Sequence, residues 1–160
     1  MKDLYEQFGE NTLTRMQAVF ASIFVVQNRL QTSYEKAQGE LTMKQWLMQT
    51  MVSVCPAPHT LTNVSAYMGC SRQNTKQLAM ALSEKGYIRL VLGPQNSVNI
   101  ELTEKAAAYD KKMEKKHEEV LRLLFSDFSE EEISSFYHLY KKLYTGIERI
   151  EKHMEENFSL

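Results

Sequence analysis

The sequence predicts a mainly α-helical fold of the α+β class, with one small β-hairpin set among helices. Three observations support this prediction. Apolar residues recur at alternating spacings of three and four near both ends of the chain, which is typical of long helices with one apolar stripe. A shorter helix with a polar outer side occupies the middle of the chain, and two alternating apolar runs joined by turn residues follow it.

The first long helix is predicted by a single stripe. Its members are Leu13, Met16, Phe20, Ile23, Gln27, Leu30 and Tyr34. We expect Gly39 to end this helix and Thr42 to cap the next one. The second helix must stop before Pro56, because a residue that precedes proline is pushed out of the helical region.

The middle of the chain predicts two further helices and a hairpin. A short helix is expected from about Thr62 to Met68, and the next has Ser71 as its N-cap and Gly86 just past its end. The runs YIRLVL and SVNIEL then alternate as strands do. Between them, the segment Gly93-Pro94-Gln95-Asn96 has the composition of a turn, so we expect a β-hairpin.

The last two helices have strong start signals. Thr103 caps a helix that runs to about Phe125, and Ser129 is followed by three glutamates, which favour the positive end of a helix dipole. The last helix again carries a regular stripe, made of Ile133, Phe136, Tyr140, Leu143, Ile147, Ile150 and Met154.

A stripe this regular on a terminal helix needs a partner helix, and the first helix carries a matching one. We therefore favour a homodimer whose N- and C-terminal helices intertwine. Packing of each stripe within its own subunit is the alternative. Residues 1–40 and 104–160 would form the helical dimerisation region, and residues 41–103 a separate lobe.

Charge is unevenly distributed along the 160 residues. The chain has 19 basic and 20 acidic residues, so its net charge does not indicate a nucleic-acid binder. Between residues 61 and 100, however, four residues are basic and one is acidic, and the rest of the chain is net acidic. The positive charge lies with the helix that Ser71 caps.

That helix has two distinct faces. Thr75, Leu78, Ala79 and Leu82 share the side expected to be buried. The outer side carries amide and basic side chains, which suit hydrogen bonding to base edges and phosphates in a major groove: Arg72, Gln73, Asn74, Lys76 and Gln77, with Met80. A short helix and a tight turn at Gly69 precede it. This is the pattern of a helix-turn-helix, with the hairpin as its wing.

The sequence resembles the multiple-antibiotic-resistance regulator (MarR) family of winged-helix transcription factors. The resemblance is carried by Leu41-Thr42 with Gln45-Trp46, by TLTNVSAYMGCSRQNTKQLAMALSEKGYI and by IELTEKA, and it covers roughly residues 12 to 150. It implies a winged helix-turn-helix with long N- and C-terminal dimerisation helices. It also implies a dimeric regulator that binds double-stranded DNA at a pseudopalindromic operator, usually as a repressor, and that a small, often phenolic, ligand or oxidation releases.

The resemblance assigns roles to individual residues. Ser71 would bond a phosphate at the helix start, and Arg72, Gln73, Asn74, Lys76 and Gln77 would face the groove. The wing departs from the family pattern, because LVLGPQNSVN lacks the usual Asp/Arg-rich tip. Gln95 and Asn96 can still bond minor-groove acceptors, but an uncharged wing adds little attraction to phosphate. A winged-helix protein-interaction module therefore stays an alternative.

Two further candidate sites are less specific. A pocket for a small aromatic effector, between the dimerisation helices and the lobe, would involve Tyr34, Met43, Trp46 and Tyr109, although ordinary core packing explains such residues equally well. Cys55 and Cys70 are candidates for a redox switch, which makes a thiol-based regulator with weak DNA binding a further alternative. The competing interpretation is that these thiols are packed and inert.

Other classes of function lack their motifs. The four histidines show no ligand-like spacing, so we expect no metal. No glycine-rich phosphate loop, nucleophile elbow or pair of catalytic carboxylates appears, so we expect neither an enzyme nor a cofactor. The longest nearly apolar stretch, AVFASIFVV, is far shorter than the ~20 residues of a membrane span. Two cysteines and no visible secretory leader favour a cytoplasmic protein.

Overall fold

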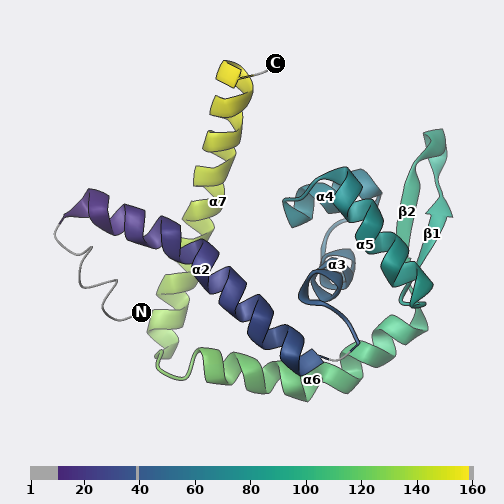
Figure 1. The fold of residues 1–160 in the computed structure, drawn as a ribbon, viewed down its shortest axis with the longest axis horizontal. Coiled ribbons are helices and arrows are strands. Elements are labelled where there is room, and N and C mark those ends of the chain that lie inside the picture. Colours follow the sequence, from purple (N-terminus) through teal and green to yellow (C-terminus); the bar gives the residue numbers. More distant parts are fainter. Residues whose placement is uncertain (1–10, 39, 159–160) are drawn as a thin grey trace. The chain divides into compact units, whose positions relative to one another are not determined.

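The computed structural model describes residues 11–38 and 40–158. The chain divides into two compact units, and the boundary between them falls between Tyr109 and Asp110. Figure 1 shows the elements in chain order. They are α2 (Thr12–Gln38), α3 (Met43–Val54), α4 (Leu61–Met68), α5 (Arg72–Glu84), β1 (Ile88–Leu92), the 3-10 turn η1 (Pro94–Asn96), β2 (Val98–Leu102), α6 (Glu104–Leu124) and α7 (Glu130–Phe158).

The helix-turn-helix consists of α4 and α5. Thr60 caps α4 by accepting the backbone N–H of Asn63, so the helix begins at Leu61, one residue before the expected start. Gly69 then takes the left-handed conformation, with φ of 60°. Glycine adopts this conformation without steric cost, and it turns the chain sharply into α5. The turn predicted at Gly69 is confirmed.

One face of α5 is packed into the lobe. Thr75, Ala79 and Leu82 are each 0% exposed, and Leu78 is half-buried. The helix ends where expected. Gly86 is left-handed at φ 78°, and its N–H donates to the carbonyl of Ser83 at 2.9 Å. The buried face predicted from the helical spacing is therefore confirmed.

Strands β1 and β2 form an antiparallel hairpin, as expected, with Leu90 opposite Ile100. Figure 1 shows it beside α5. The hairpin is also attached to the segment before α4, because the N–H of Ile100 donates to the carbonyl of His59 at 2.9 Å. This second attachment holds the wing against the helix-turn-helix.

The core of the first unit lies between the helices of the lobe and the base of the hairpin. Its largest fully buried apolar side chains come from α3, α4, α5, both strands and the residue before β1: Met48, Val64, Leu82, Tyr87, Ile88 and Ile100. Gln49 is also fully buried, and its side-chain amide donates to the carbonyl of Ala106 at 3.3 Å. The start of α6 is thereby fixed to α3.

The second unit contains the rest of α6 and all of α7. Ser129 and Glu132 form a reciprocal capping box, in which the N–H of Glu132 donates to Oγ of Ser129 and the N–H of Ser129 donates to the Glu132 carboxylate. The expected cap at Ser129 is confirmed. Helix α6 ends at Leu124, which agrees with the expected end at about Phe125. An aromatic series follows the corner into α7, with centroid separations of 5.6 to 6.2 Å: Phe125, Phe128, Phe136, Tyr140 and Tyr144.

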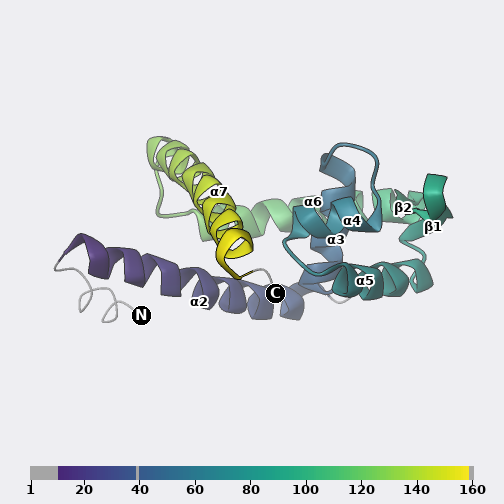
Figure 2. The same ribbon diagram turned by 90° about the horizontal axis from the view of Figure 1, so that it is seen from above.

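The two predicted stripes lie on long continuous helices, α2 and α7, which Figure 2 shows from above. Both stripes are largely exposed in the single chain. Leu13, Met16 and Phe20 are each 62% exposed, and the α7 stripe from Ile133 to Met154 is exposed along its length. Each helix among the described residues is too short or too polar to cross a lipid bilayer. Gly39, the expected end of the first helix, lies outside the described residues, and the division into lobe and dimerisation region stays a prediction.

Candidate nucleic-acid interface

The side of α5 that faces away from the core presents a row of polar side chains. All of the residues expected there are exposed: Arg72, Gln73, Asn74, Lys76 and Gln77. Guanidinium, ammonium and amide groups donate hydrogen bonds, and amides also accept them, which matches the mixed donors and acceptors of a major groove. This polar face is free to contact a ligand because the helix is packed into the lobe through its opposite face, at Thr75, Ala79 and Leu82.

The start of α5 is suited to an anion. The hydroxyl of Ser71 accepts the N–H of Asn74 at 3.3 Å, which satisfies one of the free N–H groups of the first turn. The first turn contains no acidic residue, so the partial positive charge of the helix end is not neutralised there. A phosphate fits this position by the same physics as at other helix N-termini.

The wing tip is a defined turn that presents two amides. Gln95 and Asn96 are exposed and left-handed, with φ of 55° and 58°. The N–H of Gly93 donates to the carbonyl of Ser97 at 2.8 Å and so closes the turn. A Cβ on Gly93 would lie 2.6 Å from the side chains of Asn99 and Ser97, so a larger residue here would require these two side chains to move. The closed turn thus fixes the backbone from which the two exposed amides extend.

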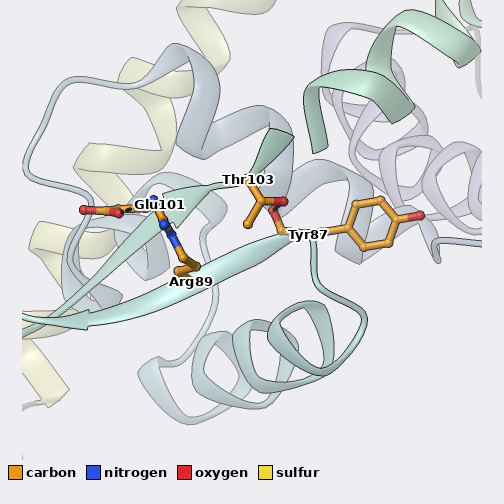
Figure 3. A network of polar contacts seen from close by, with 4 residues as sticks. All are labelled: Tyr87, Arg89, Glu101 and Thr103. Carbon is orange, nitrogen blue, oxygen red and sulfur yellow. Dashed lines mark hydrogen bonds and ion pairs between the residues drawn. The ribbon is translucent and has the colours of Figure 1, made fainter. Parts of the chain in front are cut away.

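An ion pair between Arg89 and Glu101, which was not predicted from the sequence, keeps the wing electrically neutral. Arg89 and Glu101 face each other across the hairpin, with Nη2 and Oε2 3.2 Å apart (Figure 3). Both side chains are well exposed, so the pair adds only about 0–1 kcal/mol to stability. The hairpin register places these two residues opposite each other, and the hairpin was predicted from the sequence without its register. Arg89 therefore adds little net charge to the interface.

The base of the hairpin is fastened to the start of α6. Thr103 donates its hydroxyl to the carbonyls of Gly86 at 2.8 Å and Tyr87 at 3.0 Å, and Figure 3 shows Thr103 beside Tyr87. Burial raises the pKa of Tyr87, and so does the hydrogen bond that its hydroxyl donates to the Glu40 carboxylate at 2.6 Å. The predicted cap at Thr103 is confirmed, because its hydroxyl also accepts the N–H of Ala106.

The four residues expected to line an effector pocket fall into separate contacts. Tyr34 of α2 packs on Trp46 of α3 with ring centroids 5.4 Å apart, and Tyr109 packs on Tyr87 at 5.5 Å. Met43 is half-buried at the start of α3. A shallow depression on α2 involves none of them, since its lining is Asn28, Arg29, Thr32 and Ser33. The effector pocket stays a prediction.

The two thiols are half-buried and not disulfide-bonded. Sγ of Cys70 lies 3.2 Å from the hydroxyl of Thr75, and Sγ of Cys55 lies 3.9 Å from Sδ of Met51. A redox role for either cysteine stays a prediction. Within the described residues, no group of three or more His, Cys, Asp or Glu side chains is arranged to hold a metal ion.

No protein-family model matches the sequence, and no curated protein matches it either. Solved structures do match. A MarR/EmrR family transcriptional regulator from Acinetobacter sp. ADP1 is 22% identical, with a TM-score of 0.72 over 83% of this chain and 96% of that one. Streptococcus pneumoniae FabT, solved in complex with DNA, is 22% identical, with a TM-score of 0.62 over 87% and 99% of the two chains.

A third match is an organohalide-sensing transcriptional regulator in its 2,4-dichlorophenol-bound form. It is 13% identical, with a TM-score of 0.71 over 86% of each chain. Together with the exposed helix and the hairpin, these matches define the class of fold, a winged helix-turn-helix between long terminal helices. Within this class, the chain has the fold of the MarR-family transcriptional regulators. The predicted fold class is confirmed.

Proposed function

We propose that the protein is a homodimeric, DNA-binding transcriptional regulator that acts as a repressor, and that α5 of each copy enters a major groove. One observation carries this proposal. The face of α5 opposite its buried side presents five exposed polar side chains: Arg72, Gln73, Asn74, Lys76 and Gln77. The likeness to FabT, solved in complex with DNA, supports it.

The roles of the residues follow from their positions. Ser71 and the start of α5 hold a phosphate, which sets the register of the helix on the duplex. The side chains on the outer face contact base edges and the flanking phosphates. At the wing tip, Gln95 and Asn96 donate to acceptors in the minor groove.

The exposed stripes of α2 and α7 support the homodimer. Full burial of a fully exposed large apolar side chain gains about 1.5–3 kcal/mol. Phe20, at 62% exposure, and Ile150, at 58%, still have more than half of that gain available. A second copy offers the same stripes and therefore covers them. Two α5 helices then enter successive major grooves, about 34 Å apart, of a pseudopalindromic operator.

A small aromatic effector would regulate the dimer by changing the spacing of its two α5 helices. The pocket for it involves Tyr34, Met43, Trp46 and Tyr109. A ligand that binds one spacing better than the other shifts the equilibrium and releases the DNA. The 2,4-dichlorophenol-bound regulator with the same fold supports an effector of this chemistry. We also place this regulator in the cytoplasm.

The proposal is tested by titrating the purified protein against the DNA upstream of its own gene at several salt concentrations. We expect saturable, sequence-selective binding that weakens as salt rises, because phosphate contacts release counterions. The double variant Arg72→Ala/Gln73→Ala should lose the selective binding. Lys115→Ala removes the same charge from the exposed surface of α6 and should bind like the wild type. Equal binding by the wild type and the double variant would contradict the role of α5.

The neutral wing favours a second candidate function. Because Arg89 is paired with Glu101, the hairpin contributes little attraction to phosphate. A winged-helix module that binds another protein would need no such attraction. Weak binding that is indifferent to DNA sequence, together with specific capture of a protein partner through the wing, would support this candidate.

A further inference from the structure

The C-terminal end of α5 is tied to a distant part of the chain by one lysine. The ammonium of Lys85, the residue after α5, donates to the carbonyl of Glu40 at 2.7 Å and to Oε1 of Gln45 at 2.9 Å. Glu40 lies between α2 and α3, and Gln45 is in the first turn of α3. These two bonds join the end of α5 to the junction of α2 and α3.

The acceptors of Lys85 are themselves held in place. Oε1 of Gln45 also accepts the N–H of Thr42 at 3.2 Å, as part of the capping box that starts α3, and Gln45 is only 7% exposed. The next residue, Trp46, packs on Tyr34 of α2. One turn of α3 therefore contacts both α2 and the end of α5.

Two neighbouring contacts strengthen the same joint. Tyr87 donates its hydroxyl to the Glu40 carboxylate at 2.6 Å, and the ammonium of Lys105 donates to the carbonyl of Lys85 at 2.7 Å. Lys105 also lies 4.5 Å from the centre of the Tyr87 ring. The end of α5 is thus held from the α2–α3 junction on one side and from the first turn of α6 on the other.

Electrostatics alone does not explain where the Lys85 ammonium lies. It lies at the start of α3, where the helix dipole disfavours a positive charge. An exposed lysine is free to extend into water instead. Its two directed bonds hold it there, and they occupy two of the three donors of the ammonium, aimed at Glu40 and Gln45 rather than at a phosphate.

We propose that Lys85 is a positioning residue for DNA binding, through which the α2–α3 junction sets the position of α5 in each half of the dimer. The inference rests on the proposed function, because it needs α5 to contact DNA and α2 to take part in the dimer. A movement of α2 is passed to α3 through Tyr34 and Trp46, and to α5 through Gln45 and Lys85. The spacing of the two α5 helices then follows the dimer helices.

The test compares Lys85→Met with Lys76→Met in salt titrations of operator binding. Both variants lose one positive charge and keep a side chain of similar length. Because Lys85 positions the helix without contacting phosphate, Lys85→Met should weaken specific binding about tenfold and leave the slope of log K against log salt unchanged. Lys76→Met, which removes an expected phosphate contact, should reduce that slope by about one.

A second readout is the preference for operator geometry. The wild type should discriminate strongly between the natural operator and one whose half-sites are moved apart by one base pair. Lys85→Met should discriminate less, because its α5 helices are no longer held at one spacing. Tyr87→Phe removes a neighbouring bond of the same joint while keeping the ring, and it should change the preference in the same direction. It also carries the test if Lys85→Met does not fold.

The possible results distinguish failure of the Lys85 positioning role from failure of the proposed DNA-binding function. If Lys85→Met lowers the salt slope as Lys76→Met does, Lys85 contacts phosphate and the positioning role is wrong. Wild-type affinity and wild-type spacing preference in both Lys85→Met and Tyr87→Phe would also overturn it. If the wild type itself shows no selective DNA binding, the proposed function fails first.

Discussion

At the scale of single residues, Tyr87 shows how burial and one hydrogen bond control a side chain. The ring is 2% exposed and packs on Tyr109, and the hydroxyl donates to the Glu40 carboxylate. Burial is the largest cause of its raised pKa, followed by the Glu40 hydrogen bond and the Glu40 charge. All of them favour the neutral phenol over the phenolate.

This raised pKa predicts how stability depends on pH. The folded-state pKa lies above the ordinary value of 10.0, so the contribution of Tyr87 is fully present below pH 10.0. It is lost as the pH rises above that value, because the unfolded chain then releases the proton first. Above pH 10.0, the free energy of unfolding of the wild type should fall more steeply than that of Tyr87→Phe, by up to about 1.4 kcal/mol per pH unit.

Urea unfolding of both proteins at neutral and alkaline pH measures the difference. At neutral pH, Tyr87→Phe should be less stable by about 1 kcal/mol, because Glu40 loses a hydrogen bond. The two stabilities should converge as the pH rises. Stabilities that stay a constant distance apart across the alkaline range would show that the phenol ionises as easily in the folded protein as in the unfolded chain.

At the scale of elements, helix starts were predictable because capping is local. Thr42, Ser129 and Thr103 each make the side-chain hydrogen bond that their position in the sequence indicates. The start of α4 was predicted to within one residue, and the cap that sets it is Thr60. Leu61 is 5% exposed, and its burial fits the choice of Thr60.

Contacts between elements were less predictable. The pairing of Arg89 with Glu101 depends on the hairpin register, and the bond from Lys85 to Glu40 spans 45 residues. The left-handed backbone of Gln95 and Asn96 depends on the closed turn of the wing. Such features depend on contacts between separate segments, and the residue pattern within one segment does not predict these contacts.

The stripe on α7 carries a prediction about assembly. Leu143 belongs to the stripe, while Thr145 lies off it and is exposed. Leu143→Glu would place a carboxylate from each copy in the interface, where an unpaired charge is costly, and should yield monomers. Thr145→Glu adds the same charge to the outer side of the helix and should stay dimeric.

Sedimentation velocity at micromolar concentration distinguishes these states. The dimerisation helices predicted from the stripes require a dimeric wild type and a monomeric Leu143→Glu protein. A wild type that sediments as a monomer, or a Leu143→Glu variant that remains fully dimeric, would show that α7 does not form the interface.

At the scale of the whole molecule, the two ends of the chain differ from its middle in what they bury. The core of the first unit lies mostly between Leu41 and Tyr109, whereas the apolar side chains of α2 and α7 remain largely exposed. The sequence predicted this contrast, because alternation of three and four residues marks a stripe that needs another helix. It also predicted the outer face of α5, since burial of the opposite face follows from helical spacing.

The central claim is that two α5 helices of one dimer contact successive major grooves, and hydroxyl-radical footprinting on the upstream operator tests it most directly. The account predicts protection in two stretches on one face of the duplex, about one helical turn or 34 Å apart, and loss of both in Arg72→Ala/Gln73→Ala. Protection that is absent from every upstream sequence, or that persists unchanged in the double variant, would contradict it.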